Sequence, residues 1–472
     1  MVGVSSGRFI TSGASNVGMG VNSLEANITG GKNTAVGTSA LSANTTASTN
    51  TAVGYASMQD NTTGANNVSL GYEALGDNTT AAGNVAAGYK ALRFNTTGAS
   101  LSAFGAYALY NNTTGSNNTV SGYEAMSGNT TGVNNSAFGK ASLQNNSTGN
   151  NNAASGYEAL RSNTTGTENT AAGKGALQAN TTASYNTAVG SGSLGDTTTG
   201  TNNTAVGRGS LNKNTTGSNN SSVGTASLDA NTTGAQNTAM GRESLTSNTT
   251  GNNNSVFGQG AMAANTTGTS NTASGYQALK AVATGNANTA IGYQAGYSQA
   301  GSSEGGVFLG HQAGYQDNAS HILYISRSGA NAGNNGTWIY GHSDGKCIQG
   351  NNSTSWSQAS DERIKKNITN SAKGLTKINE LQVRNFEYKT EAEIKSALGN
   401  DTLIKGIYTN AGTQTGLIAQ EVEAVLPEAV TELNSGKKTI QTDPIFWSMV
   451  KAIQELSTQN AALAARIEAL EE

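Results

Sequence analysis

Asn33-Thr-Ala-Val-Gly-Thr-Ser-Ala-Leu41, followed by Asn44-Thr-Thr46, is one unit of the repeat that decides the fold. A glycine returns at the same place in every unit, 17 residues after the previous one, from Gly20 to Gly292 without an insertion. Leu or Met stands four residues after each of these glycines except the last, and Asn stands seven residues after most of them. A fixed period with one apolar column and turn signals in every unit is typical of stacked coils, in which neighbours bury what one unit cannot.

The pattern predicts that these coils are made of β-structure. Thr34-Ala-Val36 is a short stretch of strand-forming residues, and the recurring Asn-Thr-Thr-Gly supplies turn residues. Helical repeats need about 33 residues or more, so a 17-residue unit is too short for two helices. We therefore predict a mainly β protein, with a lead-in over residues 1–19 and a β-solenoid or β-roll rod over 20–297. Seventeen layers at about 4.8 Å each give a rod of roughly 80 Å.

The interior of such a coil offers few large side chains. The candidates in a unit are one Leu or Met together with Ala, Ser or a single Val, Phe or Ile, such as Val53, Phe104 and Ile291. A single stack filled in this way is underpacked, and three stacks around one axis would bury their Leu columns against each other, so we predict a homotrimer. The units also resemble, in style though not in length, the β-rolls in the heads of trimeric autotransporter adhesins.

Composition excludes several classes of function. Only 12% of the residues are charged and the net charge is −3, with no basic runs, so we expect neither nucleic acid nor an acidic membrane surface as a partner. The single cysteine, Cys347, rules out an intrachain disulfide framework and is expected to be a small buried residue. His321 and His342 are isolated, so we predict no metal site and no cofactor. Without an export signal or an apolar span of about 18 residues, we expect synthesis in a host cytoplasm and no membrane insertion.

The repeated Asn residues have more than one interpretation. We expect Asn ladders and turns, because the Asp-containing calcium nonapeptide is absent. Threonine arrays leave an ice-binding or glycan-binding face open, but Thr is not held at alternate positions of a flat face. The many Asn-x-Thr sites are better explained as turns than as glycosylation sites, since no secretory signal precedes them.

The chain changes character near residue 360. Residues 360–472 hold 29 charged side chains, the first 359 residues hold 26, and both prolines lie in the later part. Between rod and tail, over 298–359, we predict a β stem with strands at 321–326 and 337–341. Gly310-His-Gln-Ala-Gly-Tyr315 echoes Gly292-Tyr-Gln-Ala-Gly-Tyr297, which places His311 in the structural position of Tyr293.

Two motifs in the tail carry the chemistry. Ser360-Asp-Glu-Arg-Ile-Lys-Lys-Asn-Ile368 stands at the boundary, and Gly416-Leu-Ile-Ala-Gln-Glu-Val422 leads to Leu426-Pro-Glu428. Together they resemble the intramolecular chaperone domain of phage tail spikes and fibres. This is the autoprocessing peptidase S74 family typified by endosialidase and also found in myelin regulatory factor. The resemblance covers residues 360–472 and implies an α+β domain.

The resemblance implies that the tail drives trimer assembly and then cuts itself off at Ser360-Asp361. It assigns Ser360 as nucleophile and Lys365 as base, with the adjacent Lys366 ranked second. A desolvated lysine is neutral enough to take a serine proton, and no histidine follows Ser360. Attack of a serine on its own carbonyl would need a four-membered ring. Either a neighbouring protomer supplies Ser360, or Ser360 attacks the carbonyl of Ala359. Read alone, Ser-Asp-Glu-Arg is also a helix N-cap with acidic first-turn residues.

The end of the chain predicts a coiled coil over 445–472. Apolar residues there alternate spacings of four and three, which puts them on one seam of a helix. Asp443-Pro444 would start the helix, and Phe446 and Trp447 are expected in the core. A helix that packs only on its own domain is the alternative. The seam consists of Met449, Ile453, Leu456, Asn460, Leu463, Ile467 and Leu470.

These features predict a homotrimeric viral (phage) tail fibre or spike in the virion. Its partners would be a host cell-surface glycan or protein receptor and other virion tail proteins. Its only enzymatic activity would be a single-turnover serine endopeptidase in the tail. A glycan-degrading tailspike is an alternative that needs paired carboxylates, but the rod acids are scattered. A bacterial trimeric surface adhesin is a further alternative, for which we find no export signal. The scattered acids include Glu73, Glu124, Glu158 and Glu243.

Overall fold

The computed structural model of the chain describes residues 1–299, 301–315, 320–326, 337–341, 347–349, 368–389, 393, 412–432 and 438–471. Backbone contacts divide the chain into two units, Met1–Trp356 and Ser357–Glu472. The described coils lie in the first unit, and the described helices lie in the second.

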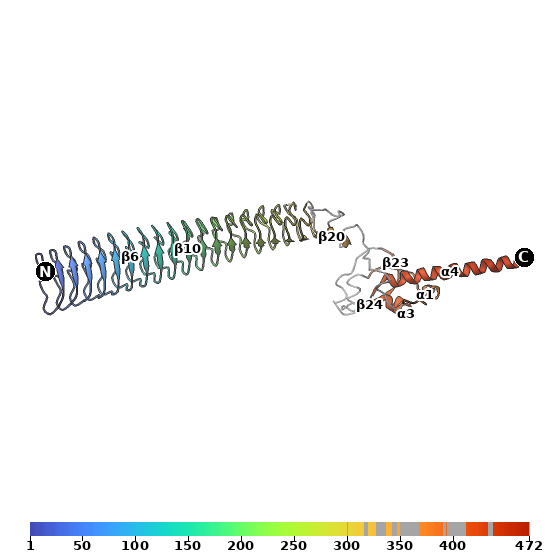
Figure 1. The fold of residues 1–472 in the computed structure, drawn as a ribbon, viewed down its shortest axis with the longest axis horizontal. Coiled ribbons are helices and arrows are strands. Elements are labelled where there is room, and N and C mark those ends of the chain that lie inside the picture. Colours follow the sequence, from blue (N-terminus) through green and yellow to red (C-terminus); the bar gives the residue numbers. More distant parts are fainter. Residues whose placement is uncertain are drawn as a thin grey trace. The chain divides into compact units, whose positions relative to one another are not determined.

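The first unit is a β-solenoid in which each coil gives one short strand to a parallel sheet (Figure 1). Thr34 pairs with Thr51, which is 17 residues further along, and the same shift holds from β1 to β17. The mainly β class and the 17-residue coil are confirmed. The strands are β1 Val17–Met19, β2 Thr34–Val36, β3 Thr51–Val53, β4 Val68–Leu70, β5 Val85–Ala87, β6 Ser102–Phe104, β7 Thr119–Ser121, β8 Ser136–Phe138, β9 Ala153–Ser155, β10 Thr170–Ala172, β11 Thr187–Val189, β12 Thr204–Val206, β13 Ser221–Val223, β14 Thr238–Met240, β15 Ser255–Phe257, β16 Thr272–Ser274 and β17 Thr289–Ile291.

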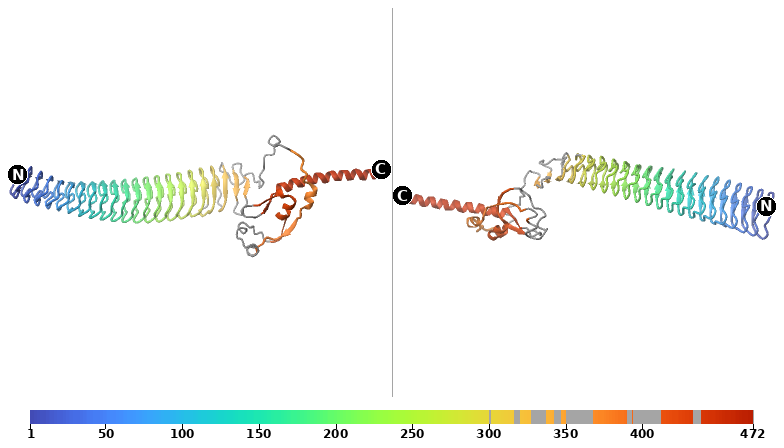
Figure 2. Two further views of the ribbon diagram at one scale, coloured as in Figure 1. Left: turned by 90° about the horizontal axis from the view of Figure 1, so that it is seen from below. Right: turned by 180° about the vertical axis from the view of Figure 1, so that it is seen from behind.

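The winding continues beyond the regular repeat at both ends (Figure 2). Val2 already forms a parallel bridge with Met19. After β17, the parallel strands β18 (Val307–Leu309) and β19 (Leu323–Ser326) follow with altered coil lengths, because Thr289 pairs with Val307 and Val307 with Leu323. Two antiparallel strands then close this sheet, β20 (Thr337–Gly341) and β21 (Cys347–Gln349). The strands predicted over 321–326 and 337–341 are confirmed as β19 and β20.

The repeated glycine stands at a corner where only glycine fits. At Gly156 φ is +140°, and a Cβ there would lie 2.5 Å from the carbonyl oxygen of Gly173 in the next coil. A side chain at this corner would therefore be strained and would push the two coils apart. We call the 17 glycines from Gly20 to Gly292 the corner glycines.

Each strand turns its middle residue into the coil and its two outer residues away from it. Ala52 is completely buried, whereas Val53 is 38% exposed, Phe104 46% and Ile291 48%. The prediction that Val53, Phe104 and Ile291 point inward is therefore wrong. The physical reason is the two-residue alternation of a strand: once the small central residue faces in, the residue before the corner glycine must face out.

The Leu/Met column is buried inside its own coil. Leu41 and Met58 are fully buried, and with the Ala columns they form one continuous apolar core from Leu24 to Tyr324. The argument that three stacks are needed to bury the Leu columns is therefore wrong. Small Ala side chains bring the walls of the coil close enough for a single Leu to fill the space.

Two columns of Asn complete the interior. The Asn44 amide donates to Asn27 Oδ1 (2.6 Å) and to the Ala47 carbonyl (3.1 Å), and Asn61 donates in turn to Asn44 (3.1 Å). In the second column, the Asn50 side chain donates to the Gly64 carbonyl (2.9 Å). These Asn side chains are fully buried, so the expected ladders are confirmed. Burial in the ladder also accords with their interpretation as turn residues rather than glycosylation sites.

The second unit is a small α+β domain with a long C-terminal helix. Its core combines Val422, Leu426, Ala429 and Ile445. Strands β22 and β23 pair antiparallel, as do β24 and β25. The elements are α1 Leu375–Glu380, β22 Arg384–Phe386, β23 Gln414–Gly416, α3 Ala419–Val425, the 3-10 turn η3 Pro427–Ala429, β24 Val430–Glu432, β25 Lys438–Ile440 and α4 Thr442–Glu471.

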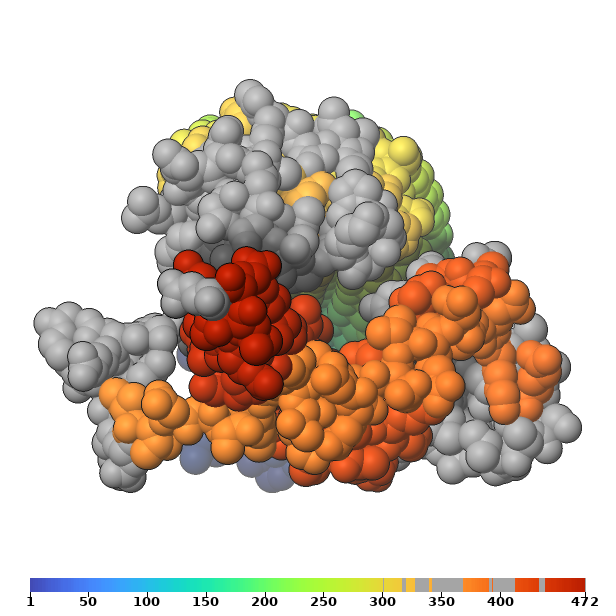
Figure 3. All heavy atoms as spheres, turned by 90° about the vertical axis from the view of Figure 1, so that its right-hand side faces the viewer, coloured from blue at the N-terminus to red at the C-terminus, as the bar shows by residue number. Residues whose placement is uncertain are grey.

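Helix α4 packs on its domain through its first half. Ile445, Ser448 and Ala452 are its buried residues. Phe446 and Trp447 are 52% and 64% exposed, so their prediction as core residues is wrong, because Ile445 and Ser448 take the inward positions. The later turns carry no buried residue, and Figure 3 looks onto this end of the helix, in red.

Candidate functional site

The predicted cleavage residues Ser360, Asp361 and Lys365, and the second-ranked Lys366, lie outside the described residues. The described part of this domain begins at Ile368. The structure does describe the second motif, residues 416–428, and the elements that contact it.

The second motif forms the centre of the domain. Gly416 ends strand β23, residues Ala419–Val425 form α3, and Pro427 opens the turn η3. Val422 and Leu426 are buried, so the apolar residues of the motif form part of the domain core. Its acidic residues point outward and form ion pairs.

Arg384 in β22 donates two hydrogen bonds to Glu421 in α3, from Nε to Oε2 at 3.1 Å and from Nη2 to Oε1 at 3.0 Å. This bidentate contact raises the pKa of Arg384 above its usual value. Lys373 donates a single hydrogen bond to Glu428 of the motif, and that hydrogen bond is the main reason that the pKa of Glu428 is lowered. The motif is thus tied to the two segments that precede it in the chain.

The long helix is also tied to the start of α1. Glu455 Oε2 accepts the backbone N–H of Leu375 at 2.8 Å, so a carboxylate from α4 caps the first turn of α1. A negative group at a helix N-terminus is favourable because the N–H groups there lack partners. Sequence analysis missed this contact, since nothing in the spacing of residues 375 and 455 signals it.

An open apolar groove of about 400 Å³ lies between the start of α4 and the adjoining strands. Its walls are almost free of polar atoms, and half-exposed Phe446 and Met449 form part of them. The groove is lined by Leu417, Ile440, Thr442, Ile445, Phe446 and Met449.

On the rod, the structure does not bring the predicted acids together. Glu73, Glu124 and Glu158 each follow a corner glycine by two residues, and are separated by three coils and two coils. At about 4.8 Å per coil the gaps are roughly 14 and 10 Å, near or beyond the upper end for an inverting pair of glycosidase carboxylates. Each of the three instead has a partner from the next coil: Arg93, Gln144 and Gln178 respectively.

Glu73 is held as a carboxylate. Burial alone would raise its pKa, but hydrogen bonds from Tyr72 and Arg93 outweigh that effect. With the positive charge of Lys90 3.6 Å away, the net result is a lowered pKa. A glycosidase acid needs a raised pKa, so Glu73 does not suit that role.

Two general features complete the description. Among the residues that the structure describes, no three His, Cys, Asp or Glu side chains gather as a metal site requires. Within those same ranges, each helix is too short or too polar to cross a membrane.

Comparison with known proteins identifies the C-terminal domain. Residues 360–431 match the Peptidase S74 family, chaperone of endosialidase. Myelin regulatory factor homolog 1 of Caenorhabditis elegans is 32% identical over 109 residues, which are 23% of this chain and 11% of that protein. No solved structure matches the chain.

A β-solenoid rod followed by this domain fits a protein of the tailspike or tail fibre type. Within that class, the match to the chaperone of endosialidase at residues 360–431 and the rod before it fit an endosialidase-type tail fibre.

Proposed function

We propose that the chain is a homotrimeric phage tail fibre or tailspike subunit that attaches the virion to a host receptor and docks on other tail proteins. The observation that carries the proposal is the chaperone-of-endosialidase match at 360–431 behind a β-solenoid rod. Residues 20–297 would form the rod, with a lead-in over 1–19, and 298–359 the stem. Residues 360–472 would direct trimer folding and then be released.

The rod supports the trimer through an exposed apolar column. The residue before the corner glycine is large, apolar and outward-facing in many coils. A long, mostly apolar stripe along a rod is favoured when copies bury it against each other, as around a threefold axis. The column includes Met19, Val53, Leu70, Phe104, Phe138, Val189, Val206, Val223, Met240, Phe257 and Ile291.

Helix α4 supports the trimer in the second unit. The seam residues Ile453, Leu463 and Ile467 are 64%, 56% and 49% exposed. A helix whose apolar seam has no partner among the described residues of its own chain suits a coiled coil between chains. The apolar groove beside Phe446 and Met449 would continue the same contact surface at the base of the helix.

Self-cleavage would use Ser360 and Lys365. Lys365 takes the proton from the Ser360 hydroxyl, and Oγ attacks a peptide carbonyl carbon. The C–N bond breaks as an ester forms, and the leaving amine takes up the proton. Water then hydrolyses the ester and frees the serine.

The position of the cut distinguishes two routes. If Ser360 of a neighbouring protomer attacks, the bond between Ser360 and Asp361 is cut, and cleavage requires assembly. If Ser360 attacks the preceding Ala359 carbonyl through a five-membered ring, the cut falls before Ser360, which becomes the new N-terminus.

The test is expression of the full chain beside Ser360→Ala and Lys365→Ala, with Lys366→Ala as matched control. Denaturing gels and intact mass spectrometry measure the fragments, and light scattering measures the oligomer. We expect wild type and Lys366→Ala to release the C-terminal domain, whereas the other two variants stay whole as trimers. A wild-type chain that remains whole would refute self-cleavage and leave a retained trimerisation domain.

A further inference from the structure

A row of aromatic side chains runs along one face of the rod. Tyr55, Tyr72 and Tyr89 each follow a corner glycine directly, and their rings stack with centroids 5.1 and 5.3 Å apart. Tyr89 then meets Tyr107 edge-on at 5.4 Å, which breaks the stack. We call this set the aromatic strip: Tyr55, Tyr72, Tyr89, Tyr107, Tyr110 and Tyr123.

The aromatic strip is not needed for coil stacking. In the six coils that contain β10 to β15, no aromatic residue follows the corner glycine, yet these coils pair in the same 17-residue register. The strip is also open to solvent, with Tyr55 51% and Tyr72 42% exposed. Exposed tyrosines that do not serve the fold are typical of contact surfaces, since they give large contact area at low entropic cost. The residues in those six positions are Lys174, Ser191, Arg208, Thr225, Arg242 and Gln259.

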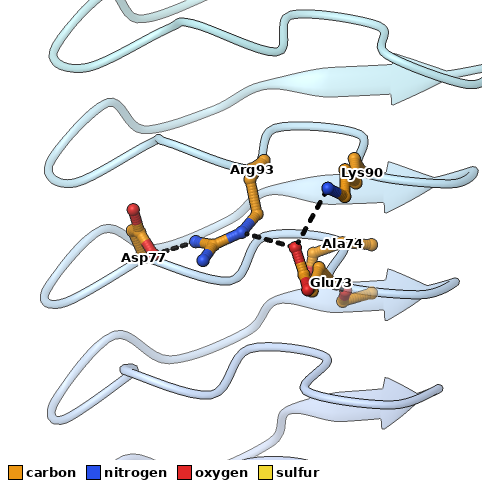
Figure 4. Close-up of polar contacts among 6 residues, drawn as sticks. Glu73, Ala74, Asp77, Lys90 and Arg93 are labelled. Atoms are coloured by element: carbon orange, nitrogen blue, oxygen red, sulfur yellow. Dashed lines mark hydrogen bonds and ion pairs between the residues drawn. The ribbon is translucent and has the colours of Figure 1, made fainter.

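An ionic network joins two neighbouring coils (Figure 4), and its Lys90 lies over the rings of Tyr72 and Tyr89. Arg93 reaches from its coil to the previous one, where it bridges Asp77 and Glu73, with 3.1 Å from Nε to Glu73 Oε2. Lys90 lies 3.6 Å from the same carboxylate and 5.4 Å from the centre of the Tyr89 ring. These side chains are only 20 to 31% exposed, so the network is held in place rather than mobile in solvent.

The same arrangement recurs further along the face. Tyr123 is followed by Glu124, and Gln144 donates to Glu124 at 2.8 Å. Tyr157 is followed by Glu158, which accepts from Gln178 at 2.6 Å. In both units, as at Tyr72, the tyrosine hydroxyl hydrogen-bonds to the carboxylate after it, which raises the pKa of the tyrosine. The face thus offers a phenol beside a fixed carboxylate at three places along the rod, which are three and two coils apart.

The charges of this face cancel. Two acids face two bases in the network, and the first 359 residues hold 13 of each sign. An anionic polymer would need a net positive surface, which is absent from the described network. Stacked rings use their faces on each other, so they present edges and hydroxyls outward, beside carboxylate, ammonium and guanidinium groups. Such groups pair with alcohols.

We infer that the aromatic strip and its ionic network form a binding site for a neutral, hydroxyl-rich glycan chain that lies along the rod. A polymer with recurring hydroxyl groups matches a face on which phenol and carboxylate groups recur at intervals of two or three coils. The inference rests on the attachment role proposed above and names its ligand class and its place.

The test uses the full chain on an array of neutral and acidic oligosaccharides. Tyr72→Ala with Tyr89→Ala removes two stacked rings of the strip. The matched control is Tyr276→Ala with Tyr293→Ala, the stacked pair at 5.3 Å in the same column near the far end of the rod. We expect wild type to bind neutral glycans, the strip variant to bind about tenfold more weakly, and the control to bind as wild type.

Phe substitutions at Tyr72 and Tyr89 should give an intermediate loss of glycan binding, because they keep the rings and remove the hydroxyl groups. Binding restricted to acidic glycans, no glycan binding by wild type, or equal binding by the strip variant would each overturn the inference. Loss of the oligomer in the strip variant would assign the strip to contacts between copies and overturn it too. If the chain binds glycan through the aromatic strip but neither trimerises nor cleaves itself, the binding site is upheld, whereas trimerisation and self-cleavage are refuted.

Discussion

At the scale of single residues, the Leu column adopts an unexpected backbone conformation. Leu41 has φ of +50° and Leu143 +49°, in the left-handed region that costs a branched side chain about 1–2 kcal/mol. Full burial of the side chain offsets this cost, as does the hydrogen bond from Leu41 N–H to the Ser57 carbonyl of the next coil (3.1 Å). Periodicity predicted the column, but it carries no information about φ.

The corner glycines give a prediction at the same scale. Gly156→Ala would place a methyl group 2.5 Å from the Gly173 carbonyl oxygen, at φ +140°. We expect it to destabilise the adjoining coils by about 2–5 kcal/mol, measured by hydrogen exchange of their strand amides. Gly175→Ala is the matched control, since φ is +64° and the nearest atom is 3.5 Å away. It should cost about 1 kcal/mol. Equal effects at the two positions would mean that coil-to-coil contact does not fix the corner.

At the scale of elements, the Asn ladder predicts a sharp difference between two neighbouring residues. Buried Asn146 donates to Asn129 Oδ1 and to the Gly149 carbonyl, both at 3.0 Å, and accepts from Asn163 at 2.7 Å. Asn146→Ala would leave buried groups unpaired, so we expect a loss of about 2–4 kcal/mol in denaturant unfolding of the rod. Asn145→Ala, at an exposed position, should change stability by less than about 0.5 kcal/mol. Similar losses would show that the ladder contributes little.

Local patterns predicted some elements and missed others for a physical reason. The coils, β19, β20 and α4 follow from periodicity and from local composition. The direction in which Val53 and Phe104 point depends on which wall of the closed coil their strand forms. A three-residue strand is too short for its sequence pattern to indicate which of its residues face inward. Strand β22 pairs with β23, and Glu455 accepts a hydrogen bond from Leu375. Both contacts join residues far apart in the chain, so no local sequence pattern predicts them.

At the scale of the whole molecule, the family of the C-terminal domain was predictable because its motifs are specific. Residues of Gly416–Val422 lie in the core of that domain, which explains why several of them are apolar. The roles of Ser360 and Lys365 stay a prediction, since both lie outside the described residues. The trimer was predicted for a wrong reason, the Leu column, and two other features now support it: the apolar column before the corner glycines and the seam of α4.

The seam of α4 gives a test of assembly that is independent of cleavage. In a Ser360→Ala background, which keeps the helix attached, Leu463→Asp would place a charge in the coiled-coil core, where it cannot be hydrated. We expect the share of chains recovered as trimers to fall by about tenfold, with monomers of 47.7 kDa or aggregates in their place. Ala465→Asp adds the same charge two residues away, on the face opposite the seam, and should leave assembly unchanged. If both variants assemble as the parent does, α4 serves only its own domain, and the outer apolar column of the rod would have to hold the three chains together.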